Sequence, residues 1–583
     1  MPEGDAEAAR MGDTTLAAPG GVGVPPETPS GTDHSQQIRQ LHEAVQREPQ
    51  NAGLWHRLGQ QLVTTGRYGD AIPVLMRTAE LDPANVLCRS ELGHLFRNLG
   101  FVDEAIHWHG EALALQPDDL TLQLNHLFVL PMVAASTEQI EACRLRCESG
   151  LAALEAGPVP HLDRGSVMIC HPFYLLYQDR DDRALMERYG RLLVSCFGQR
   201  DLCARPVIRP LNGRRLRIGF LSGFFHEHSN LRAFEGLIRH LDREAFEVVL
   251  IHLAQTPQDG ARRRLEGVCE RVEVLPAPLD QASEALQALE LDLLFFTDIG
   301  MHPFITMLAA QRSAPVQATG WGVPQTSGLA TIDYYLSGDA VEPPGAEAHY
   351  SERLVRLPGL PCCYLRESLE AVSLPRDYFL LPPDVPLWGC LQRLEKYSPD
   401  FDLALEAIAR EVPDSLFVFV EETVPSLTAF FLDRLARNAP SVRERLVMLG
   451  RMNRQEFLAL AGCLDLLLDP FHFGSGVTLY ETLHSGTPVV SLEGRFLRSR
   501  FVAGAYRLIG VDDPPVAQTP AEYVSRAVEL MRDPARRDRL RLEITARAKA
   551  HLYERLDYVR GFEDFVRQAV AEAQQLPATA ATA

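Results

Sequence analysis

Apolar runs alternate with amphipathic stretches from about residue 210 onward. The runs at 216–223 (LRIGFLSG), 246–253 (FEVVLIHL) and 291–299 (LDLLFFTDI) have the length and composition of buried strands. Amphipathic stretches such as 230–241 and 280–290 lie between them and predict helices. Because near-continuous apolar strands that alternate with helices are typical of a parallel sheet covered on both faces, we predict an α/β domain here.

The same alternation pauses at 367–384 and then starts again. New apolar runs follow, with helical patterns between them, at 386–392, 415–422, 445–450, 464–470 and 487–494. The sequence therefore predicts two doubly wound, Rossmann-like α/β domains in tandem, at 209–375 and 376–575. Ligands of such sheets bind beyond the carboxyl ends of the strands, and two domains that face each other enclose one cleft.

The N-terminal part of the chain contains a repeat of 34 residues. Proline, two glycines and an alanine recur at this interval: Pro49, Pro83 and Pro117; Gly59 and Gly93; Gly66 and Gly100; Ala71 and Ala105. Small residues at this spacing are typical of the close helix crossings of tetratricopeptide repeats. We predict an α-helical tetratricopeptide superhelix over 34–152 whose concave face binds a polypeptide; the alternative is a structural cap on the next domain.

The remaining stretches are a connector and two tails. Residues 153–208 are helical in pattern, most clearly at 179–198, and we interpret them as a helical connector. Residues 1–33 are rich in Gly, Pro, Ala and Thr and contain no aromatic residue, which predicts a disordered tail. Residues 576–583 form a short second tail.

Composition narrows the classes of function. The formal net charge of −20 disfavours binding to nucleic acid or to an anionic membrane. None of the 11 cysteines belongs to a CxxC pair, which favours a reduced protein over a disulfide or zinc framework. The N-terminus lacks the basic and apolar regions of a signal peptide, and no apolar run has transmembrane length. We therefore expect a cytoplasmic protein.

Candidate chemistry gathers at 472–490 (HFGSGVTLYETLHSGTPVV), where a predicted strand ends and a helix begins. The first N–H groups of a helix carry partial positive charge, and glycines let a phosphate approach them. A carboxylate one turn into the helix can accept hydrogen bonds from a ribose diol. We therefore predict a nucleotide diphosphate site formed by the loop and the helix, at Gly474, Ser475, Gly476, Val477, Thr478 and Glu481.

Two further strand exits carry side chains suited to the same ligand. In 389–402 (GCLQRLEKYSPDFD), Lys396 follows Gln392 at the end of a predicted strand and could neutralise a diphosphate. In 449–460 (LGRMNRQEFLAL), Met452, Arg454 and Phe457 enter a helix that could hold a base between backbone groups and an aromatic face. Each pattern alone is equally typical of an ordinary surface turn.

Together and in this order after the repeats, the three segments resemble the O-linked N-acetylglucosamine transferase and SPINDLY-like glycosyltransferase family, in a bacterial-type form. The resemblance covers about residues 34–575. It also rests on 216–230 (LRIGFLSGFFHEHSN), 314–344 (APVQATGWGVPQTSGLATIDYYLSGDAVEPP) and 350–359 (YSERLVRLPG). It implies the glycosyltransferase B fold and inverting transfer of sugar from a nucleotide diphosphate. It implies no metal ion and no cofactor.

In the second α/β domain, the resemblance implies roles at matching positions. Lys396 matches the lysine that stabilises the leaving diphosphate, and Gln392 resembles the amide residue before it, with a spacing one residue longer. Thr478 matches a phosphate-binding threonine, whereas Gly476 and Val477 replace the histidine and threonine that precede it in the family. The remaining matches are the ribose-binding acid at Glu481, a base-stacking histidine replaced by Phe457, and a base-side lysine replaced by Arg454.

In the first α/β domain, His228 matches the family's active-site histidine, with His226 as a nearby alternative. The loop 322–328 (GVPQTSG) matches a loop that contacts the donor, through Pro324, Thr326 and Ser327. Asp298 ends a predicted strand and is either a proton acceptor or a cap for the following loop. The general base stays open among His228, Asp298, a water chain and a donor phosphate oxygen.

The predicted function is transfer of N-acetylglucosamine from UDP-N-acetylglucosamine to Ser or Thr of a polypeptide that the repeats present. The first alternative keeps the fold but uses GDP-fucose or UDP-glucose, or acts on Asn or a small molecule. The second alternative is a catalytically dead repeat scaffold. The expected partners are the nucleotide sugar and the acceptor polypeptide, without nucleic acid or membrane span, and an oligomer stays open.

Overall fold

The computed structural model describes residues 31–158, 169–197, 205–210, 212–369 and 373–575. The predicted tails lie almost entirely outside these ranges. The chain divides into two compact units. The first unit is Met1–Pro131 with Pro160–His171 and Thr423–Leu427, and the second is Met132–Val159, Pro172–Glu422 and Thr428–Ala583.

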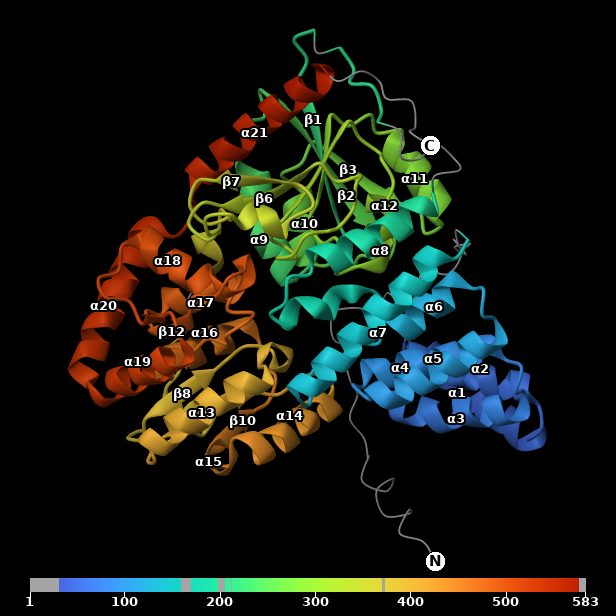
Figure 1. The fold of residues 1–583 in the computed structure, drawn as a ribbon, viewed down its shortest axis with the longest axis horizontal. Helices are drawn as coiled ribbons and strands as arrows, with labels where there is room; N and C mark the ends of the chain where they lie inside the picture. Colours follow the sequence, from blue (N-terminus) through green and yellow to red (C-terminus); the bar gives the residue numbers. More distant parts are fainter. Residues whose placement is uncertain (1–30, 159–168, 198–204, 211, 370–372, 576–583) are drawn as a thin grey trace, which may run out of the picture. The chain divides into compact units, whose positions relative to one another are not determined.

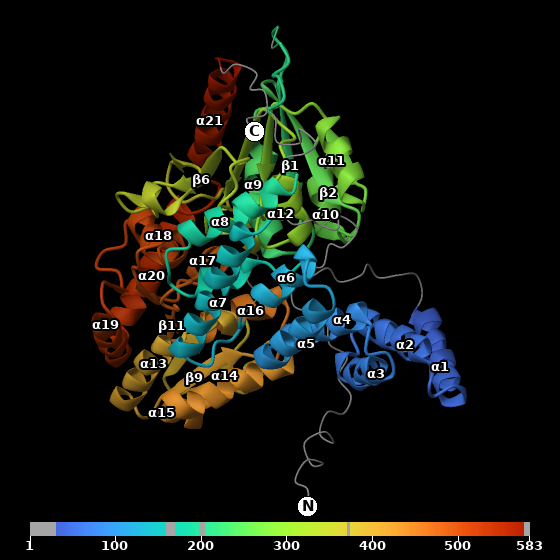
Figure 2. The ribbon, with the colours of Figure 1, turned by 45° about the vertical axis from the view of Figure 1, so that its right-hand side comes forward.

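The first unit contains the repeat helices, blue in Figures 1 and 2. They are α1 (Gly31–Arg47), α2 (Ala52–Thr64), α3 (Tyr68–Leu81), α4 (Val86–Asn98), α5 (Val102–Leu115) and α6 (Leu120–Leu127). A Cβ atom at Gly59 would lie 2.5 Å from the Leu75 side chain, and one at Gly93 would lie 2.6 Å from the His109 ring. The repeated glycines therefore allow the close helix crossings that the 34-residue period predicts.

The second unit begins with α7 (Thr137–Ala156), the one-turn helix η2 (Pro172–Tyr177) and α8 (Arg183–Ser195). A seven-stranded sheet follows, with strand order β3-β2-β1-β4-β5-β6-β7 and parallel pairing throughout. Its strands are β1 (Leu216–Ser222), β2 (Phe246–Leu253), β3 (Arg271–Leu275), β4 (Leu293–Phe296), β5 (Val316–Gly320), β6 (Tyr334–Gly338) and β7 (Arg353–Leu357). The helices between the strands are α9 (Ser229–His240), α10 (Gly260–Glu266), α11 (Leu279–Gln287) and α12 (Pro303–Ala309).

A six-stranded parallel sheet forms the second lobe of this unit, with strand order β10-β9-β8-β11-β12-β13. Its strands are β8 (Leu387–Cys390), β9 (Leu416–Val420), β10 (Leu446–Leu449), β11 (Leu466–Leu468), β12 (Val489–Leu492) and β13 (Val516–Ala517). Its helices are α13 (Pro399–Glu411), α14 (Pro425–Asn438), α15 (Pro440–Glu444), α16 (Arg454–Cys463), α17 (Val477–His484), α18 (Phe501–Ile509), α19 (Pro520–Arg532) and α20 (Pro534–His551). The predicted pair of Rossmann-like sheets after a helical region is confirmed.

The last helix, α21 (Leu556–Gln575), follows the second sheet in sequence but packs against the first (Figure 1). The Phe562 ring lies 6.0 Å from that of Phe220 and 5.8 Å from that of Phe295, both on strands of the first sheet. We predicted that 376–575 would form one domain, but α21 contributes to the core of the preceding lobe. The other predicted domain boundaries stay predictions.

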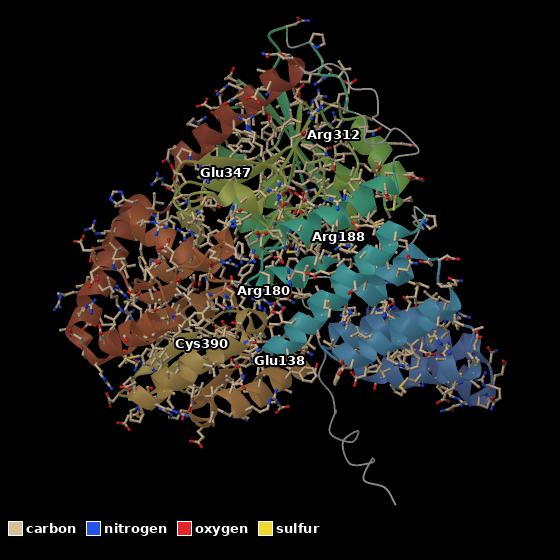
Figure 3. All side chains as sticks on the ribbon, viewed as in Figure 1. Glu138, Arg180, Arg188, Arg312, Glu347 and Cys390 are labelled. Carbon is tan, nitrogen blue, oxygen red and sulfur yellow. The ribbon has the colours of Figure 1, made fainter. Side chains whose placement is uncertain are left out.

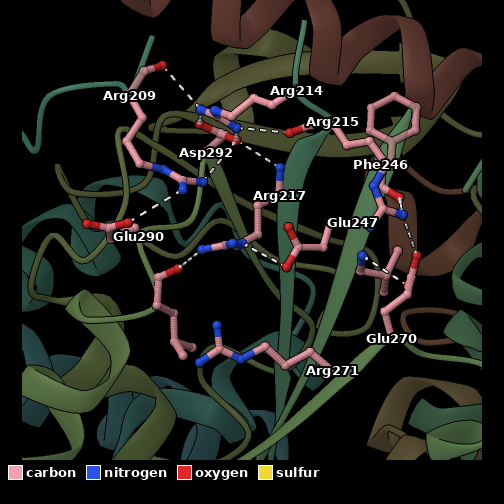
Figure 4. A network of polar contacts seen from close by, with 12 residues as sticks. Arg209, Arg214, Arg215, Arg217, Phe246, Glu247, Glu270, Arg271, Glu290 and Asp292 are labelled. Atoms are coloured by element: carbon pink, nitrogen blue, oxygen red, sulfur yellow. Dashed lines mark hydrogen bonds and ion pairs between the residues drawn. The ribbon is translucent and has the colours of Figure 1, made fainter. Parts of the chain in front are cut away.

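An arginine-rich network closes the amino edge of the first sheet (Figure 4). Asp292 is buried and accepts hydrogen bonds from two Arg214 nitrogens, both at 2.6 Å, and from the Arg217 backbone N–H at 2.8 Å. Charged groups are thus paired at the end of the sheet opposite the carboxyl edge. Among the described residues, no helix is long and apolar enough to cross a membrane.

Candidate active site

Two neighbouring strands of the second sheet carry the candidate phosphate-binding residues. β8 and β11 are adjacent in space although β9 and β10 lie between them in sequence, so the strand order reverses here. Gln392 follows β8, and the loop 469–476 follows β11. The residues therefore meet at the topological switch point, where ligands of doubly wound sheets bind.

Lys396 lies at this switch point, at the end of the one-turn helix η7 (Leu394–Lys396). Its Nζ atom donates hydrogen bonds to Gln392 Oε1 and to the Gly474 carbonyl oxygen, both at 2.9 Å. It also lies 4.4 Å from the centre of the Phe473 ring. Burial lowers the pKa of the Lys396 ammonium to about 8, an effect that Asp469 and Glu395 oppose. No described carboxylate lies within ion-pair distance of Nζ.

The Gln392 side chain connects the two strand exits. Its Nε2 donates to Ser475 Oγ at 2.9 Å and to Thr478 Oγ1 at 3.0 Å. Ser475 in turn donates from its backbone N–H and its hydroxyl to Asp469 Oδ1, at 2.8 and 2.7 Å. The buried Asp469 carboxylate thus fixes the start of the loop, while the predicted phosphate-binding residues form one connected network.

The glycines of this loop serve different purposes. A Cβ at Gly474 would lie 2.3 Å from Asp469 Oδ2, so only glycine fits. Gly476 is the N-cap of α17 and supplies no side-chain hydrogen bond to the helix. A Cβ atom at Gly476 would have room, because its nearest neighbour would be Trp321 of the first lobe at 3.8 Å. Val477 and Thr478 are the first residues of the helix. Their backbone N–H groups lie where an anion gains from the helix dipole.

Glu481 and Arg454 form an ion pair with each other. A ligand that binds either side chain has to displace the other. Arg454 Nε donates to Glu481 Oε1 at 2.8 Å, and Arg454 Nη2 donates to the Tyr364 hydroxyl at 2.9 Å. Tyr364 also donates to Glu481 Oε1 at 3.2 Å. Arg232 of α9 lies 3.6 Å from the same oxygen, so this buried carboxylate joins the two lobes.

Met452 and Phe457 lie before and within the first turns of α16, both partly buried. Asn453 caps the helix and forms a capping box with Glu456, which fixes the helix start. A contact of Phe457 or Met452 with a base stays a prediction.

His228 is the N-cap of α9, at the carboxyl edge of the first sheet. Its Nδ1 accepts a hydrogen bond from the Asn230 backbone N–H at 3.1 Å, which places the ring hydrogen of the neutral form on Nε2. Burial, with smaller effects of His226, Arg232 and Arg393, lowers its pKa to about 3. A neutral ring with hydrogen on Nε2 can donate to a substrate oxygen, but it is a weak base.

Asp298 lies beneath the same edge and is fully buried. Its Oδ2 accepts from the Gly223 backbone N–H at 3.1 Å, and its Oδ1 accepts from the Thr297 hydroxyl at 3.0 Å. Burial raises the pKa of this carboxyl to about 7. These contacts anchor the loop after β1; both predicted roles of Asp298, as a proton acceptor or as a cap for the loop that follows it, stay predictions.

The loop 322–328 directs its hydroxyls to Glu352. Thr326 Oγ1 donates to Glu352 Oε2 at 2.7 Å, and Ser327 donates to Oε1 from both its backbone and its hydroxyl. Pro324 and Thr326 line a pocket with Asp181, Asp182, Gln325, His349, Tyr350, Phe496, Leu497 and Arg498. The described contacts thus hold the loop in place and do not link Ser327 to the phosphate network.

Comparison with known proteins identifies the fold and the domain. The structure is similar to that of a mutant O-GlcNAc transferase from Thermobaculum terrenum, with a TM-score of 0.69, 25% identity, and coverage of 93% of this chain and 95% of that one. Residues 367–562 match the model of glycosyl transferase family 41. The chain carries a glycosyl transferase family 41 domain. This domain contains the Lys396 network and the Arg454–Glu481 pair.

Curated relatives agree with the resemblance inferred from the sequence. A probable UDP-N-acetylglucosamine–peptide N-acetylglucosaminyltransferase SPINDLY from Solanum lycopersicum is 25% identical over 61% of this chain and 38% of its own length. A UDP-glucose:protein N-beta-glucosyltransferase from Actinobacillus pleuropneumoniae is 26% identical over 43% of this chain and 40% of its own length. The chain spans about two fifths of the length of the curated relatives it matches.

Sequence reasoning missed three residues around Lys396: Asp469, Phe473, and Tyr177, whose ring lies 4.9 Å from that of Phe473. Asp469 and Phe473 flank the predicted loop, but their roles depend on packing. One signal was available in the composition: Lys396 and Lys549 are the only two lysines among 57 basic residues. In a chain that otherwise uses arginine, a lysine at a strand exit indicates that a compact ammonium is needed there.

Outside the family 41 domain, His94, His109 and Cys170 have ligand atoms within 4.8 Å of one another. However, His94 Nε2 lies 3.2 Å from the Asn125 amide nitrogen, and its Nδ1 faces Cys170 Sγ at 3.9 Å. Arg97 donates to the same sulfur at 3.2 Å. Because both His94 nitrogens are engaged and a guanidinium faces the thiol, we interpret this cluster as packing of the His94 and His109 rings against the segment at Cys170, not as a metal site.

Proposed function

We propose that the protein transfers a sugar from a nucleotide diphosphate to a polypeptide, with UDP-N-acetylglucosamine as donor and Ser or Thr as acceptor. The choice of donor is supported by the names of the SPINDLY relatives and of the Thermobaculum enzyme. The reaction inverts the anomeric centre and needs no metal ion. The repeats hold the acceptor polypeptide.

One observation carries the proposal: among the described residues, the Lys396 ammonium contacts two neutral oxygens and an aromatic ring but no carboxylate, at the start of a glycine-rich helix entrance. A partly buried cation without a carboxylate partner is poised for an anionic ligand. A diphosphate between Lys396 and the α17 N-terminus would meet positive charge from both sides. Together these supply the charge that a metal ion provides in other transferases.

The acceptor hydroxyl attacks the anomeric carbon from the face opposite the diphosphate and gives up its proton to the general base, for which Asp298, His228, a water chain and a donor phosphate oxygen are the candidates. As the bond to the diphosphate breaks, negative charge grows on the bridging oxygen, and Lys396 with the α17 N-terminus stabilises it. The hydrogen on His228 Nε2 can be donated to an oxygen of the bound substrate, which fixes the orientation of the sugar. Glu481 exchanges its arginine contacts for the ribose diol.

A donor screen tests this function. The purified chain is titrated calorimetrically with UDP and GDP, and then assayed for hydrolysis and transfer with UDP-N-acetylglucosamine, UDP-glucose and GDP-fucose. Binding of UDP with transfer from UDP-N-acetylglucosamine is the expected result. Binding of GDP-fucose alone, or transfer from UDP-glucose alone, would replace the donor while keeping the site.

The two lysines provide a matched pair of variants. Lys396→Ala is expected to lower transfer at least about 100-fold, because it removes a charge contact made in the transition state. Lys549→Ala removes an exposed lysine on α20 and is expected to retain wild-type activity. Unchanged turnover in Lys396→Ala would overturn the mechanism.

A further inference from the structure

We propose that Phe473, supported by Tyr177 from the connector, is a positioning residue that holds the Lys396 ammonium charged and aimed at the leaving diphosphate. The inference rests on the proposed function and assigns a role to a segment outside the family 41 domain. That segment, residues 172–182, is called the strap below.

The three side chains form a stack. The Tyr177 ring lies 4.9 Å from the Phe473 ring with an interplanar angle of 23°. Lys396 Nζ lies 4.4 Å from the centre of the Phe473 ring. Phe473 directly precedes Gly474, whose carbonyl accepts from the same Nζ. The ring therefore contacts the ammonium and the strap at once.

Other strap residues fix the loop that carries Phe473. Asp179 Oδ2 lies 3.4 Å from His472 Nδ1, and Asp179 has a φ of 50°. The Arg180 carbonyl (residue labelled in Figure 3) accepts from Arg498 Nη2 at 2.9 Å. The Arg498 carbonyl accepts from the Gly474 N–H, also at 2.9 Å. The strap thus reaches His472, Phe473 and Gly474, the last through Arg498.

An aromatic face suits this cation for a physical reason. A carboxylate against Nζ would neutralise the ammonium and compete with the diphosphate, whereas a ring quadrupole stabilises the charge without adding a negative one. The charged groups that act on Lys396 are Asp469 and Glu395, which favour its protonated form, and Arg393, which disfavours it. Phe473 therefore offsets part of the desolvation cost and leaves the charge available to a ligand.

Competitive acetylation of the full chain tests the inference without relying on activity. The protein is labelled with acetic anhydride across a pH series, and mass spectrometry compares Lys396 with the exposed Lys549 as internal reference. In Phe473→Leu, the midpoint of the Lys396 labelling curve is expected at lower pH, so that labelling at pH 7 rises about tenfold. The labelling rate at high pH, where Lys396 is fully deprotonated, reports how accessible its side chain is. A change in this plateau is thereby distinguished from a shift of the midpoint, which reports the charge.

Three further variants sharpen the test. Phe473→Tyr keeps the ring and is expected to keep the wild-type midpoint. Tyr177→Leu acts through Phe473 and is expected to lower the midpoint pH by less than Phe473→Leu does. Tyr177→Phe keeps the stacked ring and is expected to keep the wild-type midpoint. An unchanged midpoint in Phe473→Leu, with an unchanged melting temperature, would overturn the role of the ring.

Kinetics connect the stack to the reaction. With the donor that the screen identifies, Phe473→Leu is expected to lower kcat about tenfold with little change in KM, because the contact matters most as charge develops on the leaving group. If the wild-type chain binds no nucleotide and transfers no sugar, the proposed function fails. The labelling experiment still decides whether Phe473 stabilises the Lys396 charge.

Discussion

At the scale of single residues, the site contains two charges with opposite surroundings. Glu481 shares one oxygen among Arg454, Tyr364 and Arg232, whereas Lys396 meets two neutral oxygens and a ring. The paired carboxylate contributes to the contact between the lobes and would have to exchange partners to take the proposed ribose-binding role. The cation needs no such exchange, so Lys396 is expected to receive the diphosphate first.

The protonation of Lys396 predicts a pH dependence. Because its pKa of about 8 lies below the ordinary lysine value, the charged fraction falls as pH rises through about 8. We expect kcat/KM, which reports the free enzyme, to decline above that pH. The corresponding limb of kcat is expected at higher pH, because a bound diphosphate stabilises the ammonium. Lys396→Arg, charged at all accessible pH values, is expected to react more slowly and to lack this limb.

The role of Glu481 predicts a preference for ribose. If its carboxylate accepts from the ribose hydroxyls, the wild-type chain is expected to bind UDP about tenfold more tightly than 2′-deoxy-UDP, the typical effect of one charged hydrogen bond. Glu481→Gln is expected to bind UDP more weakly and to lose most of this preference. Calorimetric titration of the wild-type chain and of Glu481→Gln with UDP and with 2′-deoxy-UDP measures this preference. A variant that keeps the full preference would assign ribose recognition to another residue.

At the scale of elements, the turn between β11 and α17 provides a steric test. Gly474→Ala places a methyl group 2.3 Å from Asp469 Oδ2, so the loop must shift and the Ser475–Gln392 contact is lost. We expect a large loss of transfer activity and a lower melting temperature. Gly476→Ala meets its first neighbour at 3.8 Å and is the matched control, with a milder effect expected on both measurements. Equal effects of the two substitutions would contradict the steric account.

Much at this scale could be predicted from the sequence. Apolar runs at regular spacing gave the strands, and the small residues after 464–470 marked the helix entrance where the Lys396 network lies. The directions of side chains could not be predicted, because they depend on partners distant in sequence. Thr326 and Ser327 bind Glu352, and Arg454 binds Glu481. Tyr177 reaches Phe473 only through the fold of the connector.

At the scale of the whole second unit, the chain makes the core of the first lobe from two separate segments. Residues 216–357 supply the sheet, and α21 returns to it after the second lobe is complete. Glu563 of α21 accepts from the Asp242 backbone N–H at 2.8 Å. The first lobe therefore cannot complete its packing until the C-terminal helix is present.

The packing of α21 against the first sheet predicts where a C-terminal substitution acts. Phe562→Ala removes a fully buried ring that contacts Phe220 and Phe295, and such truncations cost about 3–5 kcal/mol. We expect hydrogen exchange followed by mass spectrometry to reveal lost protection in β1 and β4 but not in β8–β13. This result is informative because β8–β13 lie closer to residue 562 in sequence than β1 and β4 do. Phe431→Ala, a buried ring beside Tyr397 and Phe419, is the matched control with protection lost in the second sheet. Protection lost equally in both sheets for each variant would mean that the lobes unfold as one cooperative unit.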